Sequence, residues 1–95
     1  MPLFALIGWD GPDAAALRQQ HRPAHLEGIE ALAAQGRLRQ AGPLLDSAGQ
    51  PCGSLVVFEA ANLDAARQFA AADPYIVNGV FGRYEVHETR VVLPR

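Results

Sequence analysis

The hydrophobic pattern of the chain opens with a continuous apolar run rather than an alternating one. Residues 2–9 have the sequence PLFALIGW, and the turn-forming residues 10–12, DGP, end the run. A short apolar run bounded by a turn is typical of a strand with both faces covered, whereas a half-exposed strand alternates apolar and polar positions. We therefore predict a first strand over residues 2–9 that is apolar on both faces.

A helix is predicted next, because residues 13–35 are rich in Ala, Leu, Arg, Gln and Glu and Gly36 follows as a C-terminal stop. The apolar positions in this segment have three- and four-residue spacing. They form one stripe, which consists of Leu26, Ile29, Leu32 and Ala33. The stripe predicts that one face of the helix is buried.

Pro23 interrupts the helical segment. A proline in a helix interior costs about 3 kcal/mol or more, whereas the first helical turn tolerates it. We therefore predict that a short helix from residue 13 ends near Gln20 and that a second one begins around residues 22–23. Such a break or kink would place His25 in an opening turn, where backbone amides are free and the helix dipole favours anions.

The second half of the chain predicts a hairpin, a helix and a strand. Residues 37–45 and 54–60 flank a turn-rich loop, and the latter segment, SLVVFEA, has the valine and phenylalanine content of a strand. An alanine-rich helix is predicted over residues 62–72, with Asn62 as its N-cap. Residues 80–92 alternate between a more apolar and a more polar face, which indicates a last strand.

The predicted order of elements is β-α-β-β-α-β, the split arrangement of the α+β ferredoxin-like fold, with a four-stranded antiparallel sheet and both helices on one face. Two helices cover only one face of such a sheet, yet residues 3–7 and 55–58 are apolar on both faces. Large exposed apolar patches usually mark an interface. We therefore expect one domain over residues 1–95 that pairs sheet to sheet as a homodimer or a higher homo-oligomer.

The charge balance argues against a polyanionic partner. The chain has 95 residues, with eight basic side chains, all arginine, ten acidic ones and a net charge of −2. Phosphate binding draws on clustered Lys and Arg, and these arginines are scattered, so we expect no nucleic-acid partner. Cys52 is the only cysteine, and the sequence contains neither a secretory signal nor an apolar run of about 20 residues. We therefore expect a soluble, cytoplasmic protein with no membrane partner.

Two titratable residues are candidates for chemistry. His25 precedes Ile29 by four positions and lies at the margin of the buried stripe, where small shifts move an imidazole pKa across neutrality. Asp73 stands at the C-terminal end of a predicted helix, where the dipole disfavours a carboxylate, so a protonatable partner or a substrate would explain its position. The pattern leaves two alternatives open: a histidine that only packs or caps, and an Asp-Pro pair that only begins a turn.

The remaining polar residues give weaker signals. His21 and His87 are expected on the surface, and the spacing of the histidines matches no metal-ligand motif, so we expect no metal. Gly42-Pro43 either lets a ligand approach the backbone or is simply a turn. Tyr75 offers either a phenolic hydrogen-bond donor or a ring packed over the helix end.

Three motifs give the chain a family resemblance. RPAHL at residues 22–26, GRLRQAGPL at 36–44 and DPYIVNGV at 73–80 occur in the order and at roughly the spacing of YciI-like proteins. The chain resembles that family over almost its whole length and differs in the short loop at 46–53 and in the tail. The resemblance implies the ferredoxin-like fold and its pairing into a dimeric α+β barrel.

The resemblance also implies a site built on the motif histidine and aspartate, His25 and Asp73. Dehydrochlorination of a chlorinated hydroxyhydroquinone is an activity associated with the family. On this basis we predict a small-molecule enzyme of lyase or dehalogenase type, with a phenolic or quinol substrate and no cofactor. In that mechanism Asp73 fixes the tautomer of His25, whose other ring nitrogen exchanges a proton, while Arg22 or backbone amides stabilise a phenolate or enolate. The alternative is a non-catalytic dimeric module that binds a metabolite or associates with another enzyme.

Overall fold

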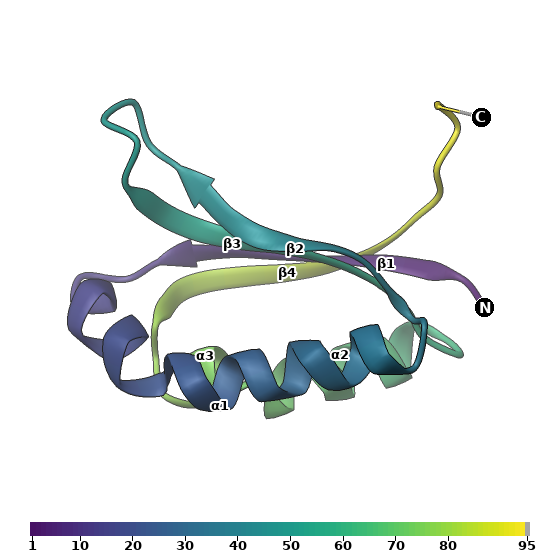
Figure 1. Cartoon of the computed structure of the whole chain (residues 1–95), viewed down its shortest axis with the longest axis horizontal. Helices are drawn as coiled ribbons and strands as arrows, with labels where there is room; N and C mark the ends of the chain where they lie inside the picture. Colours follow the sequence, from purple (N-terminus) through teal and green to yellow (C-terminus); the bar gives the residue numbers. More distant parts are fainter. Residues whose placement is uncertain (95) are drawn as a thin grey trace.

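A computed structural model describes residues 1–94 and contains one four-stranded antiparallel sheet with all helices on the same face (Figure 1). The elements, in chain order, are β1 Leu3–Asp10, α1 Ala14–Ala34, β2 Leu38–Leu45, β3 Pro51–Glu59, α2 Leu63–Ala72, α3 Pro74–Val77 and β4 Phe81–Thr89. The strand order in the sheet is β2-β3-β1-β4. The ferredoxin-like fold predicted from the sequence is confirmed.

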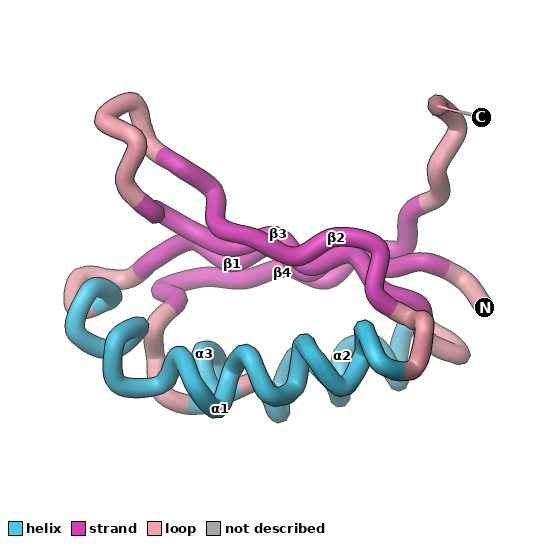
Figure 2. Tube along the Cα trace, in the orientation of Figure 1, coloured by secondary structure: helices cyan, strands magenta, loops and turns pink. Residues whose placement is uncertain are grey.

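The predicted break at Pro23 is wrong. α1 is a single helix that contains Pro23 in its interior, and its first turns are inclined to its long C-terminal part (Figure 2). Proline removes one backbone hydrogen bond and bends a helix, but burial of the following turns against the sheet holds the two parts together. His25 therefore lies inside a continuous helix and not in an opening turn.

The observed bounds of two strands differ from the predicted ones, because backbone pairing with the neighbouring strand sets where each begins or ends. β3 begins at Pro51, earlier than predicted, because the register with β2 continues to the pair Leu45 and Pro51. The turn between these strands is closed by the Asp46 carboxylate, which accepts hydrogen bonds from the backbone N–H groups of Ala48 and Gln50. β4 ends at Thr89, which is its last residue paired with β1 and lies opposite Leu3.

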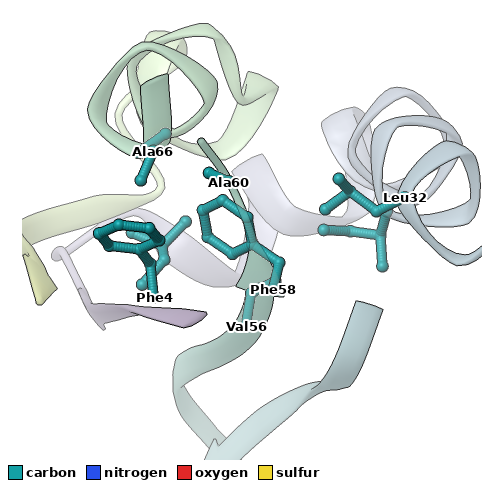
Figure 3. Close-up of a cluster of buried hydrophobic side chains, with 9 residues drawn as sticks. Phe4, Leu32, Val56, Phe58, Ala60 and Ala66 are labelled. Atoms are coloured by element: carbon teal, nitrogen blue, oxygen red, sulfur yellow. The ribbon is translucent and has the colours of Figure 1, made fainter. Parts of the chain in front are cut away.

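The core lies between the sheet and the helices. Phe4 of β1 and Phe58 of β3 are fully buried, and their ring centroids are 6.5 Å apart. Figure 3 shows Phe58 between Leu32 of α1 and Ala66 of α2. Full burial of a side chain of this size contributes about 1.5–3 kcal/mol, so these contacts fix both long helices on one face.

The opposite face of the sheet has no covering element among residues 1–94. It presents residues that alternate with the core positions and are only half-buried, which are Ala5, Ile7, Leu55 and Val57. Along β4 the same face is polar, because Ala5 and Ile7 pair with His87 and Glu85. The expectation of central strands that are apolar on both faces is confirmed.

Candidate active site

The corner between α2 and α3 positions Asp73. α2 ends at Ala72 because a residue before proline is disfavoured in the helical region, and Asp73 is accordingly extended. Its Oδ1 then accepts a hydrogen bond of 2.8 Å from the backbone N–H of Tyr75, which makes Asp73 the N-cap of α3. The carboxylate that stands at the unfavourable end of α2 is thus stabilised by the first turn of the next helix.

His25 and Asp73 meet through their side chains. His25 Nδ1 lies 2.8 Å from Asp73 Oδ1 and 3.1 Å from Oδ2, and both residues are buried, at 9% and 5% exposure. An ionised carboxylate only accepts hydrogen bonds, so Nδ1 carries the hydrogen. In neutral His25 the lone pair is therefore on Nε2, which can accept a proton while Asp73 holds the ring.

Tyr75 holds the imidazole from the side. The rings of His25 and Tyr75 are stacked, with centroids 3.9 Å apart and an angle of 2° between their planes. Phe81 supports Tyr75 from behind, edge to face, at 5.9 Å. Burial raises the pKa of the Tyr75 phenol above its ordinary value of about 10, and the guanidinium groups of Arg18 and Arg22 oppose only part of that rise. The phenol is therefore protonated at neutral pH.

A cavity of about 1030 Å³ opens beside this stack, between the N-terminal half of α1 and strands β2 and β3. All of the site residues predicted from the sequence except Asp73 line it, namely Arg22, His25, Gly42, Pro43 and Tyr75. Asp73 lies behind His25. Apolar side chains from three elements complete the wall, including Leu26, Ile29 and Val56.

The free ring nitrogen of His25 opens into this cavity. His25 Nε2 has no hydrogen-bond partner within the described part of the chain, whereas no side-chain nitrogen or oxygen of that part is both enclosed and unpaired. Nε2 is therefore accessible, and His25 lines the cavity. The arrangement can deliver a proton to a ligand or remove one from it.

A second polar cluster in the cavity was not predicted from the sequence; it consists of Asp10, Arg18 and Ser54. Arg18 forms a bidentate ion pair with Asp10, at 3.0 Å from Nε and 2.7 Å from Nη2. Its Nη2 also lies 2.8 Å from the Gly53 carbonyl oxygen and 3.1 Å from Ser54 Oγ. One signal was present: Arg18, Arg22 and His25 are spaced by four and three residues, which places them on one helix face.

Several other residues lie outside the site. His87 is exposed on the sheet face without helices and contacts Glu85 at 2.7 Å. His21 and Cys52 do not line the cavity. Among residues 1–94, no three histidine, cysteine or acidic side chains are grouped as a metal site, and no helix is long and apolar enough to cross a membrane.

The chain is similar in sequence to known proteins over most of its length. Residues 2–90 match a family described as the YCII-related domain. Over 90 residues the chain is 38% identical to protein YciI of Escherichia coli O6:H1, which covers 88% of this chain and 92% of that protein. It is 33% identical over 84 residues to an uncharacterized protein of Haemophilus influenzae, with 82% and 86% covered.

A solved structure gives a further likeness. The fold matches that of 5-chloro-2-hydroxyhydroquinone dehydrochlorinase, TftG, from Burkholderia phenoliruptrix AC1100, with a TM-score of 0.82 and 27% sequence identity. The match covers 93% of each chain. That protein was solved in complex with 2,5-dihydroxybenzoquinone.

Proposed function

The chain belongs to the YciI-like family, and from this premise we propose that it is a cofactor-free enzyme of lyase or dehalogenase type that uses His25 and Asp73 for general acid–base catalysis. The observation that carries the proposal is the buried Nδ1–carboxylate hydrogen bond, which leaves Nε2 of His25 open to the cavity. The likeness to a dehydrochlorinase supports the reaction class.

The mechanism begins with neutral His25. Its Nε2 takes a proton from an O–H or C–H of the substrate, and the electrons released form a new double bond as a halide departs with its bonding pair. Asp73 stabilises the imidazolium, which then passes the proton to water. Proton transfer by a positioned side chain contributes typically about 10²- to 10⁴-fold in rate.

The proposed substrate is a small phenolic or quinol compound. A flat ring fits between the apolar walls, with the Tyr75 phenol and the Arg22 guanidinium within the same cavity to interact with its oxygens. Gly42 and Pro43 form the opposite wall on β2, where the absence of a long side chain leaves room for the ring. The quinone bound by the dehydrochlorinase supports this class of ligand.

We also propose that two copies of the chain pair through the uncovered sheet face. The half-buried apolar residues of β1 and β3 lie at its centre. The β2–β3 hairpin tip and the exposed C-terminal segment at residues 90–94 both extend on this side of the sheet (Figure 1), so they would flank a second copy. Closing such a face removes apolar surface from water.

Turnover of chlorinated hydroquinones by wild type and variants tests the catalytic proposal. We expect His25→Ala and Asp73→Ala each to lower kcat by at least about 100-fold, because each removes part of the proton-transfer pair. His21→Ala is the matched control, since His21 lies on the same helix outside the cavity. Circular dichroism would confirm that the variants are folded. Full activity in both His25→Ala and Asp73→Ala would refute the proposal, and binding without conversion in the wild type would favour a non-catalytic module.

A further inference from the structure

The cavity has a second polar end, which the acid–base proposal leaves unused. Arg18 of α1, Asp10 of β1 and Ser54 of β3 meet there, although 44 positions separate Asp10 from Ser54 along the chain. All three residues line the cavity. Even a partly buried ion pair costs free energy to desolvate, so its presence in a cavity wall calls for a functional reason.

The hydrogen bonds of Arg18 leave one edge of the guanidinium free. A guanidinium has five N–H groups. Nε and Nη2 donate to Asp10, and Nη2 also donates to the Gly53 carbonyl and to Ser54 Oγ. Nη1 makes no hydrogen bond of ordinary length among residues 1–94, where every enclosed side-chain nitrogen has a partner, and the Tyr75 phenol is the neighbouring group that interacts with the guanidinium. The two N–H groups of Nη1 are therefore accessible on a residue that faces the cavity.

Ser54 contributes a further donor. The residue is buried, with 7% exposure, and its side chain lies on the helix-facing side of β3, two positions before the core residue Val56. Its Oγ accepts a hydrogen bond from Arg18. The hydroxyl hydrogen is consequently left to donate in another direction, and the cavity adjoins this residue.

The charge of the cavity wall favours an anion. The charged side chains that line it are Asp10, Arg18 and Arg22. Asp10 uses both carboxylate oxygens on Arg18, which fixes the guanidinium in place and cancels its charge. Arg22 adds a positive charge to the wall that pairs with no acidic side chain among residues 1–94. Donors held rigid before the ligand arrives are the arrangement that stabilises an oxyanion at least cost.

The two polar ends are close enough for one small ring to reach both. The Tyr75 ring is a neighbour of both ends: its centroid is 3.9 Å from that of His25 and 5.2 Å from Cζ of Arg18. The imidazole and the guanidinium are thus separated by no more than the sum of these distances. A six-membered ring with oxygens on opposite sides, extended by one hydrogen bond at each end, can span a gap of this size.

We propose that Arg18 and Ser54 form an oxyanion-binding subsite that selects cyclic substrates with an acidic ring hydroxyl, bound as its enolate or phenolate, opposite the atom that reacts at His25. Asp10 acts as a positioning residue for Arg18. This proposal rests on the proposed function, because the role of His25 fixes how the substrate is oriented in the cavity. It adds that the substrate binds as an anion and that a second group of side chains recognises it.

Calorimetric binding of two quinones tests the subsite without requiring turnover. One is 2,5-dihydroxybenzoquinone, which has acidic hydroxyls, and the other is 2,5-dimethoxybenzoquinone, which has the same ring but none. Ser54→Ala and Arg18→Gln are compared with Ser47→Ala and Arg67→Gln, whose side chains are exposed. All proteins carry Cys52→Ala, because thiolates are nucleophiles that add to quinones.

We expect the wild-type site to bind the dihydroxy compound at least about 10-fold more tightly than the dimethoxy compound. Ser54→Ala and Arg18→Gln should each weaken binding of the dihydroxy compound by roughly 10-fold or more and leave the affinity for the dimethoxy compound unchanged. The two control variants should bind both compounds as the wild type does. Ser54→Ala keeps the test valid if loss of Arg18 unfolds the protein.

Equal affinity of wild type for the two quinones, no binding of the dihydroxy compound, or unchanged selectivity in Ser54→Ala would overturn the subsite. The same titrations in His25→Ala separate this proposal from the catalytic one. Selectivity that persists in His25→Ala, together with no conversion of any compound by the wild type, would support the subsite and count against the enzyme. Turnover by the wild type that is lost in His25→Ala, without selectivity between the two quinones, would do the reverse.

Discussion

Substitution of Asp73 probes both of the contacts that its carboxylate makes. Oδ1 accepts the backbone N–H of Tyr75 and lies 2.8 Å from His25 Nδ1, so one side chain caps a helix and orients the imidazole. Asp73→Ala removes both contacts. Asp73→Asn retains a side-chain oxygen for the cap but removes the negative charge that stabilises an imidazolium.

The magnitude follows from adding the two losses. Truncation of an N-cap typically costs about 1 kcal/mol, within a range of about 0.5–2. A buried polar group left without its partner, here His25 Nδ1, costs about 1–3 kcal/mol. We therefore expect Asp73→Ala to lower the free energy of unfolding by about 2–4 kcal/mol. For a domain of this size each kcal/mol corresponds to about 4–8 °C in Tm.

Urea denaturation followed by circular dichroism measures this difference. Asn62→Ala is the matched control, because Asn62 caps α2 by accepting a 2.8 Å hydrogen bond from the Ala65 N–H and is itself exposed. It should cost only about 1 kcal/mol. In the double variant His25→Ala/Asp73→Ala the unpaired group is absent. Its loss in free energy of unfolding should therefore be smaller than the sum of the losses in the two single variants.

Two results would refute the reasoning. The first is a loss in Asp73→Ala no larger than that in Asn62→Ala, which would mean that the contact with His25 contributes nothing to stability. The second is strict additivity in the double variant, which would mean that the two side chains do not interact in the folded protein. Asp73→Asn should be more stable than Asp73→Ala while losing activity, because the cap remains and the charge does not.

Two further predictions concern the stack and the uncovered sheet face. The folded state raises the pKa of Tyr75, so the unfolded chain loses that proton first; stability from this group should be complete below about pH 10 and decline as pH rises through the folded pKa. Urea denaturation at pH 8 and pH 11 should show a larger loss for wild type than for Tyr75→Phe, and equal losses would contradict it. Val57→Glu places a charge at the centre of the uncovered face and should give a monomer in size-exclusion chromatography with light scattering, whereas the exposed Glu88→Gln should not; a Val57→Glu protein that assembles as wild type does would exclude this face as the interface.

The sequence predicts the fold because hydrophobic period and turn residues are local signals. The apolar run at residues 2–9 and the valines of β3 identify the central strands without any tertiary information, and Asn62 identifies the start of α2. The four-residue helix α3 was not predicted, since a single turn is too short to show a period. The break at Pro23 was predicted wrongly because its local cost was weighed without the packing of the helix on the sheet.

The candidate site was predictable only in part, for a similar reason. The link between His25 and Asp73 came from family motifs, because no local rule connects residues 48 positions apart. Arg18 was not predicted as a site residue, because its hydrogen-bond partners come from β1 and β3 and meet it only in the folded chain. Asp10 was interpreted as a turn residue, and its carboxylate instead anchors that arginine.

The double contact of Asp73 Oδ1 has a consequence for how the site fluctuates. The oxygen that orients the imidazole is also the oxygen that closes the first turn of α3. If that turn opens transiently, His25 loses the acceptor that defines its tautomer in the same event. The amide proton of Tyr75, whose exchange with solvent requires this opening, therefore reports how large a fraction of the molecules is without an oriented histidine at any moment.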